Sequence, residues 1–351
     1  MALALAAPSV QAAQPANKYP EALRIAGVSF FVDNKVVFTG LSAVIAEQGW
    51  LEAELKKRGV RLEWFPAPNA NVGAAINEAF ANGSIDFAGY GDLPSIILNA
   101  AGVETRVIVP SGRGSDTFLV VPADSKAQSI DDLKGQRIAI HRGRPWEVPL
   151  IRLMESRDLG YKDFRILNIN QVAAAAALAA HNIDAMYTLT DAYLLEDRKV
   201  GRIIWSTKQA PVDWKMRAEL WAAKKFIDAH PDLTQLVATA YVKAAHWAAQ
   251  AENEEAMVRI SARSGTPESV VRREFADEAT PWKERWSPLF GNAVSAHYQH
   301  TVDYAVDKKL IRKSVDSQRL LDPRFVPVAL KQLQLENFWS AAPAVAGRVT
   351  P

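Results

Sequence analysis

Two arginines stand close together in a loop whose residue types suit the binding of an anion. Residues 141–147 read His-Arg-Gly-Arg-Pro-Trp-Glu, with Arg142 and Arg144 directly before an expected helix. Cations at a helix start oppose the helix dipole and cost roughly a few tenths of a kcal/mol, so their presence needs a reason. The planar guanidinium group binds sulfonate, carboxylate or phosphate oxygens through two hydrogen bonds. We predict that one of these arginines contacts an anionic ligand; the alternatives are an exposed salt bridge with Glu147 and a contact between lobes.

A second candidate anion site lies in residues 83–94. A short apolar strand at 85–88 leads to Gly89 and Gly91, and a helix is expected to begin at Asp92 with a proline in its first turn. Backbone N–H groups at such a helix start hold anions, and the glycines let the backbone approach a ligand. Each glycine alone is equally consistent with a simple turn. We expect Asp92 to cap the helix rather than to contact an anion, because its carboxylate would repel one.

Two further groups of residues are candidates for chemistry. His297, His300 and Asp303 are spaced so that they share one face of an expected helix, where they could bind a metal or simply form a polar helix face. His141 and Glu147 could form an acid–base pair. No Gly-x-Ser-x-Gly turn or phosphate-binding loop accompanies them. We therefore predict no catalytic residue, no metal and no cofactor.

Composition narrows the class of protein. The chain has 351 residues, 49% of them hydrophobic and 23% charged, with a formal net charge of +2, which suits two globular lobes. It has no block of basic residues that would predict a nucleic-acid partner, and no apolar run near the roughly 20 residues that span a bilayer. Cysteine is absent, which excludes disulfides, thiolate nucleophiles, Cys-ligated zinc, iron–sulfur clusters and a lipid anchor on cysteine.

The two ends of the chain carry their own expectations. Residues 1–16 are apolar and alanine-rich and contain Val-Gln-Ala at 10–12, which resembles a cleavage site. The positively charged start of a full secretory signal is missing. This segment is therefore a signal-peptide remnant or a disordered tail, and export to the periplasm as a soluble protein fits the remainder better. Residues 341–351 are expected to be disordered.

Apolar and helical patterns alternate along the first two thirds of the chain. Strands are expected at 23–28, 60–65, 85–88, 105–110, 117–122, 136–140, 164–167, 183–187 and 202–205, and helices at 41–58, 71–82, 92–101, 148–159, 172–181 and 191–197. Such alternation predicts parallel α/β sheets. A polar, Gly-rich loop at 111–116 separates two strand–helix series, and after residue 208 the pattern becomes helical.

Three sequence segments resemble segments of the solute-binding proteins of ABC importers, in the nitrate, sulfonate and taurine branch. The first is Glu-Gln-Gly-Trp-Leu-Glu at 47–52, near the end of the first helix. The second is the strand and Gly-Asp-x-Pro helix start within 83–94. The third is Asp-Leu-Lys-Gly-Gln-Arg-Ile-Ala at 132–139, followed by Asn-Ile-Asp-Ala at 182–185. Their order and spacing extend the resemblance over roughly residues 23–310.

The resemblance implies an α/β fold with two Rossmann-like lobes around a hinge, the type II periplasmic binding protein fold, with extra C-terminal helices. Lobe 1 would comprise residues 18–113 and a helical second part at 211–340, and lobe 2 residues 114–210. The implied function is that of a monomeric importer component, which captures a small organic anion between the lobes and delivers it to a membrane permease. The alternative is an enzyme on the same fold, acting on a heterocycle or an organic acid.

The resemblance also implies which loops hold the ligand. Carried over by position, the predicted ligand-binding residues are Ser29, Phe30 and Phe31; Gly89, Tyr90, Gly91 and Asp92; Arg142, Gly143, Arg144, Trp146 and Glu147; Tyr187, Thr188, Thr190 and Asp191; and Trp214.

This chain departs from its relatives at Arg144, because a Gly-Ser pair often opens that helix in the family. Trp146, Tyr90, Tyr187 and Trp214 would line the cleft and pack an organic body, or else belong to the core. If two or more of them line the cleft, the ligand is larger and more apolar than nitrate. Because of this departure, the expected ligand is a sulfonate or a comparable acid rather than an inorganic anion or taurine.

Overall fold

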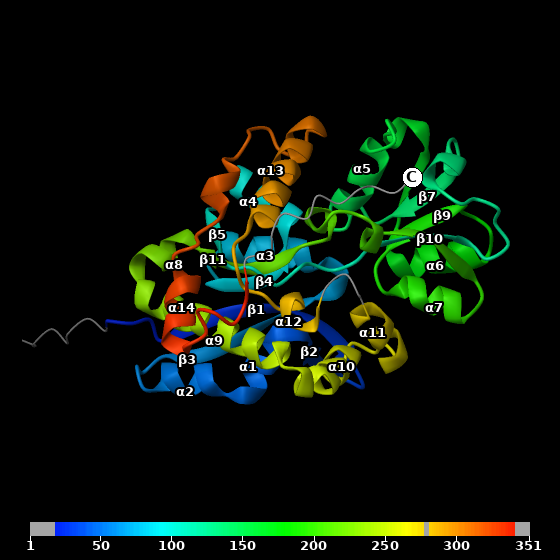
Figure 1. Cartoon of the computed structure of the whole chain (residues 1–351). Helices are drawn as coiled ribbons and strands as arrows, with labels where there is room; N and C mark the ends of the chain where they lie inside the picture. The colour runs from blue at the N-terminus through cyan, green and yellow to red at the C-terminus, as the bar shows by residue number, and fades with distance from the viewer. Residues whose placement is uncertain (1–17, 277–280, 341–351) are drawn as a thin grey trace, which may run out of the picture.

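The computed structural model describes residues 18–276 and 281–340, and it contains two β-sheets. Figure 1 shows these sheets in two bodies that lie side by side, each flanked by helices. The predictions for residues 1–16 and 341–351 lie outside the described residues. The α/β class with two lobes and additional C-terminal helices is confirmed. The exact lobe limits stay a prediction.

The first sheet has the strand order β2-β1-β4-β11-β5, and β3 also pairs with β1. Its strands are β1 (Ala22–Val32), β2 (Lys35–Phe38), β3 (Arg61–Pro68), β4 (Phe87–Gly91), β5 (Thr105–Val109) and β11 (Ala218–Ala223). Its helices are α1 (Gly40–Gln48), α2 (Trp50–Lys56), α3 (Val72–Ala81) and α4 (Asp92–Ala100). Strands β1, β3 and β4 are parallel, so their carboxyl ends meet at one edge of the sheet.

The second sheet has the strand order β10-β6-β9-β7-β8. Its strands are β6 (Phe118–Pro122), β7 (Arg137–Ile140), β8 (Arg165–Asn168), β9 (Ala185–Thr188) and β10 (Gly201–Ser206), and its helices are α5 (Glu147–Glu155), α6 (Gln171–Ala179) and α7 (Asp191–Asp197). Strand β7 is parallel to both β8 and β9, as the alternating pattern predicts. Strand β6 is antiparallel to β9 and β10, so the sheet is mixed rather than parallel throughout.

Two segments cross between the sheets and pair with each other. Ser115 on the outgoing segment and Met216 on the returning one exchange backbone hydrogen bonds of 2.8 and 3.0 Å. Beside them, the buried ammonium group of Lys215 lies 3.1 Å from the carboxylate of Asp116, which also accepts a hydrogen bond from Thr207 at 2.9 Å. This two-stranded crossover is the hinge between the sheets.

The last third of the chain is mostly helical. Its helices are α8 (Lys224–Ala229), α9 (Pro231–Ala249), α10 (Glu254–Ala262), α11 (Glu268–Phe275), α12 (Trp282–Arg285), α13 (Asn292–Asp307) and α14 (Phe325–Leu333). Most of them pack with the first sheet, but α11 contacts α7 of the second sheet. Val270 on α11 joins the apolar cluster of the second sheet, and Arg273 pairs with Glu196 and Asp197. Helix α11 also packs against α10, so it contacts both the C-terminal helices and the second lobe.

Several expected elements end elsewhere, for local reasons. The expected helix 41–58 is divided into α1 and α2 at Gly49, whose φ of +63° ends the first helix. The expected loop after residue 28 is a hairpin, because β1 continues to residue 32 and turns at Asp33 and Asn34, both with positive φ. Strand β4 runs on to Gly91. Strand β11 lies in a region expected to be helical.

We expect a side chain at Gly112 in the crossover to destabilise the protein more than one at Gly135. Both glycines have positive φ, but a Cβ at Gly112 would lie 1.7 Å from the carbonyl oxygen of Arg285, whereas nothing lies within 4 Å at Gly135. Gly135→Ala should cost about 1 kcal/mol through its backbone conformation, and Gly112→Ala roughly 2–5 kcal/mol through conformation and overpacking. Urea unfolding of both variants measures this, and equal losses would contradict the role of the close contact.

Candidate functional site

The two lobes meet where strands end. Arg144, in the loop between β7 and α5, donates a hydrogen bond from Nη2 to the carbonyl oxygen of Asn69 at 3.0 Å, and Asn69 directly follows β3. The next residue, Pro145, packs on Gly91 at the end of β4, where an added Cβ would lie 2.0 Å from the proline Cγ. Ligands of open α/β sheets bind outside such carboxyl ends. This junction is the candidate site.

Arg144 is a buried cation without an anion beside it. Its exposed fraction is 8%, its Nε has no hydrogen-bond partner, and its guanidinium carbon lies 4.8 Å from the centre of the Trp146 ring. In the described part of the chain, no carboxylate forms an ion pair with it. Burial lowers the pKa of Arg144, because the charged form has lost water and gained no countercharge. A guanidinium in this state favours a negatively charged ligand.

Arg142 is in the opposite situation. Its Nε donates to Oε1 of Glu147 at 3.0 Å, so the salt bridge named as an alternative is present for this arginine. Glu147 is 1% exposed and also accepts hydrogen bonds from Tyr161 (2.7 Å), Tyr304 (3.0 Å) and the N–H of Gly143 (2.5 Å). These four donors do not include His141, so the acid–base pair considered as an alternative is not formed. Tyr304 lies on α13, so this bond is a second link between the lobes.

The start of α4 differs from the expected anion-binding turn. Gly91, not Asp92, is the residue before the helix, and its φ of −71° belongs to extended backbone, so the predicted capping role of Asp92 and the glycine turn are both wrong. The N–H of Leu93 donates to Oδ1 of Asp92 at 2.5 Å, and the N–H of Asp92 points to the carbonyl oxygen of Arg217 at 3.4 Å. These two donors of the first turn are thus occupied by the chain itself.

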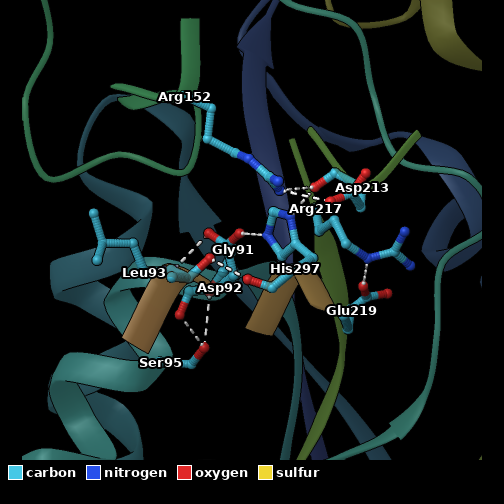
Figure 2. A network of polar contacts seen from close by, with 10 residues as sticks. Gly91, Asp92, Leu93, Ser95, Arg152, Asp213, Arg217, Glu219 and His297 are labelled. Carbon is cyan, nitrogen blue, oxygen red and sulfur yellow. Dashed lines mark hydrogen bonds and ion pairs between the residues drawn. The ribbon is translucent and has the colours of Figure 1, made fainter. Parts of the chain in front are cut away.

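The carboxylate of Asp92 is paired with a histidine from the far end of the sequence. Asp92 and His297 are both fully buried, and Oδ2 of Asp92 contacts Nε2 of His297. The other ring nitrogen of His297 lies 3.0 Å from the carbonyl oxygen of Asp213, in the returning crossover. The carboxylate of Asp213 in turn pairs with Arg152 of α5 at 2.8 Å. Figure 2 shows His297 between Asp92 and Asp213.

The three residues considered as metal ligands do not converge. His297 is committed to Asp92, His300 lies 3.7 Å from Glu155, and Asp303 accepts a hydrogen bond from Gln299. Burial, with the nearby charge of Arg152, lowers the pKa of His300 to about 4. Within 18–276 and 281–340, no group of three His, Cys, Asp or Glu side chains is arranged to hold a metal ion.

Two of the four aromatic candidates belong to the core. Tyr90 is 1% exposed and packs with Phe80 and Trp221, because β4 is longer than expected and its side chain points into the first lobe. Tyr187 is also 1% exposed, and its hydroxyl lies 2.6 Å from that of Thr117. Of the two alternatives given for these aromatic residues, the core position applies to both.

The other two aromatic candidates lie beside arginines. The ring of Trp146 is buried beneath the guanidinium group of Arg144. Trp214 lies in the returning crossover, with the guanidinium carbon of Arg152 at 5.1 Å from its ring centre. Of the two, only Trp146 adjoins the buried cation without a countercharge.

The loop at the start of α7 is covered by α11. Thr190 donates to Oε2 of Glu274 at 3.0 Å, and Thr188, fully buried, donates to Asp191 at 3.3 Å. Burial raises the pKa of both Asp191 and Glu274, and Glu274 comes from a helix that the sequence did not connect with this loop. Carboxyl groups of the chain therefore occupy the place where the resemblance implied a ligand anion.

Of the residues predicted from the first strand, Ser29 lies beside the junction, because it pairs with Pro68 of β3 and Asn69 follows directly. Ser29, Phe30 and Phe31 lie within β1 and pair with β2 of the hairpin. Ser29 is buried, and Phe31 is 72% exposed. The sequence pattern does not point to Asn69 or Tyr304, because Asn69 contributes a backbone carbonyl and Tyr304 lies 157 residues from its partner Glu147. It points to His297 only as a possible metal ligand, because the partner Asp92 lies 205 residues away.

The chain is similar to known periplasmic binding proteins in sequence and in fold. The model of the family described as "ABC transporter, phosphonate, periplasmic substrate-binding protein" matches residues 48–256. A crystal structure from Methylobacillus flagellatus KT, of a protein named as the periplasmic sulfonate-binding protein SsuA, is 47% identical with a TM-score of 0.86, over 92% of this chain and 97% of that one. A Bacillus subtilis (strain 168) protein named as an aliphatic sulfonates-binding protein is 24% identical, over 82% of this chain and 84% of its own length.

A likeness to an enzyme is limited to the fold. The desulfurization enzyme DSZB is 16% identical with a TM-score of 0.67, over 90% of this chain and all of that one. Among the residues that the structure describes, no helix is both long and apolar enough to cross a membrane. The family match and the 47% identical relative agree with each other: this chain belongs to the periplasmic substrate-binding proteins of ABC transporters, in the group that contains the sulfonate-binding SsuA proteins.

Proposed function

We propose that this protein captures a small organic monoanion, a sulfonate, at the junction of its lobes and delivers it unchanged to the membrane permease of an importer. The observation that carries this proposal is the buried guanidinium of Arg144, which has no carboxylate partner. An anionic headgroup would supply the missing countercharge and accept the free Nε–H. Trp146 beneath it has an indole N–H that is also buried without an acceptor.

The balance of charges around the junction supports a monoanion. Arg142 is balanced by Glu147, Arg152 by Asp213, and Asp92 by His297. One positive charge, that of Arg144, is left for the ligand. A sulfonate carries a single negative charge at all ordinary pH values, and two of the relatives described above are named as sulfonate-binding proteins. A dianion would bring an excess negative charge into a poorly hydrated place.

The remaining features of the proposal follow from the family. The protein would be exported to the periplasm as a soluble monomer, with the sulfonate and the permease as its partners, and without nucleic acid. We expect the protein to bind the ligand without transforming it. Glu147 accepts hydrogen bonds from four donors, and none of these donors is a histidine that could act with it in acid–base catalysis. The predicted limits of lobe 1 and lobe 2, near residues 113 and 210, would be the ends of the bodies that close on the ligand.

Arg144→Ala should weaken binding of butanesulfonate by tenfold or more. Charge-assisted hydrogen bonds contribute about 1.5–3 kcal/mol each, and the variant removes the countercharge of the ligand. Arg142→Ala is the matched control, because Arg142 is already neutralised by Glu147, and its effect should stay within about threefold. Isothermal titration calorimetry gives both affinities, and an unchanged dissociation constant for Arg144→Ala would remove this residue from the site.

The pH dependence of binding should separate a sulfonate from a phosphonate of the same chain length. Between about pH 6.5 and about pH 9, butanesulfonate keeps one charge, whereas butylphosphonate loses its second proton. Burial and the nearby Arg144 lower the pKa of His141, so this histidine stays neutral over the range and adds no charge. Affinity for butanesulfonate should therefore stay constant, and affinity for butylphosphonate should fall as the pH rises. Tighter phosphonate binding at high pH would show that the site takes a dianion.

A further inference from the structure

We propose that His297 is a positioning residue of the anion site: it neutralises the carboxylate of Asp92 at the start of α4 and so protects the bound anion from a second negative charge. The inference rests on the proposed function of the junction, and it concerns a residue on a helix remote in sequence. His297 lies on α13, which packs against α4 and against the returning crossover.

The hydrogen-bonding partners of His297 define how many protons the pair holds. Nδ1 lies 3.0 Å from the carbonyl oxygen of Asp213, which can only accept, so Nδ1 carries a proton. Nε2 contacts Oδ2 of Asp92, and a contact between two such atoms requires a proton between them. The pair therefore holds two protons and has no net charge. Both side chains are fully buried, so water does not share in this neutralisation.

The other charged groups packed around His297 are already paired. Asp213 in the crossover is bound to Arg152 of α5, and on β11 Arg217 donates to Glu219 at 2.5 Å. His300, one turn further along α13, lies near Glu155. Its lowered pKa, of about 4, makes it neutral near physiological pH. In Figure 2, Arg217 and Glu219 lie on the side of His297 away from Asp92, and Arg152 reaches Asp213 from above. His297 is the side chain that hydrogen-bonds the carboxylate of Asp92, and the guanidinium group of Arg217 also attracts this carboxylate.

Asp92 is the neighbour in the chain of the residue that meets the second lobe at the junction. It directly follows Gly91, the residue on which Pro145 packs, and Pro145 directly follows Arg144. Buried charges interact more strongly than charges in water, because few solvent dipoles screen them. An unpaired carboxylate at this position would oppose the anion that Arg144 attracts.

Helix α13 serves the second lobe in the same way. Tyr304 lies seven residues after His297, so the two side chains project from the same face of the helix. Tyr304 donates to the buried Glu147, while His297 pairs with Asp92. One helix face therefore satisfies a buried carboxylate in each lobe, on the two sides of the junction.

The test compares His297→Gln, Asp92→Asn and the double variant, with butanesulfonate as the probe. His297→Gln should weaken binding at least tenfold, because it leaves the carboxylate of Asp92 without its protonated partner. The double variant has no carboxylate at position 92, so it should recover most of the affinity. Asp92→Asn alone should bind at least tenfold more tightly than His297→Gln.

Further comparisons distinguish the proposed role of His297 from a purely structural role of this residue and from a failure of the proposed function. His300→Gln, one turn along α13 and without a contact to Asp92, should bind like the wild type. If His297 only held the fold, Asp92→Asn would lose as much affinity as His297→Gln, and the double variant would not recover; either result overturns the inference. If His297→Gln fails to fold, the comparison of Asp92→Asn with the wild type decides, and a tenfold loss there also overturns it. A wild-type protein that does not bind butanesulfonate at all would instead overturn the proposed function.

Discussion

A positive charge buried between two lobes, without a negative charge beside it, is the constraint on which the rest of this site depends. Arg144 reaches from the second lobe to a backbone carbonyl of the first, and the packing of Pro145 on Gly91 excludes bulkier residues from the contact. Desolvating a guanidinium is costly unless an anion replaces the lost water. The chain tolerates this cost in the place where a binding protein of this family would meet its ligand.

The surrounding ionisable groups are arranged so that this single charge stays available. Glu147 accepts four hydrogen bonds, and Asp92 is paired with His297. Helix α13 supplies donors to both carboxylates. Selectivity for charge would then come from the sum of these pairs rather than from one residue, which differs from a site built on free N–H groups at a helix start.

The departure from the expected glycine turn has a structural origin. Because β4 extends to Gly91, the two glycines lie in a strand, where a missing side chain gives room for Pro145. The same extension directs Tyr90 into the core. At the start of α7, Glu274 from α11 meets Thr190, so neither of the two expected helix starts is free of the chain's own groups. Under the proposed function, anion recognition would fall to side chains of the loop between β7 and α5.

The sequence alone determined the α/β class, the two strand–helix series, the family resemblance and the loop that carries the arginines. These features follow from local periodicity and from turn residues, which act within a few positions of one another. Only the tertiary structure decided that Arg142 is paired and Arg144 is not, that Asp92 meets His297, and that Tyr90 and Tyr187 lie in the core. Charge pairing and burial depend on residues up to about two hundred positions apart, and local sequence patterns do not reveal contacts between such distant residues.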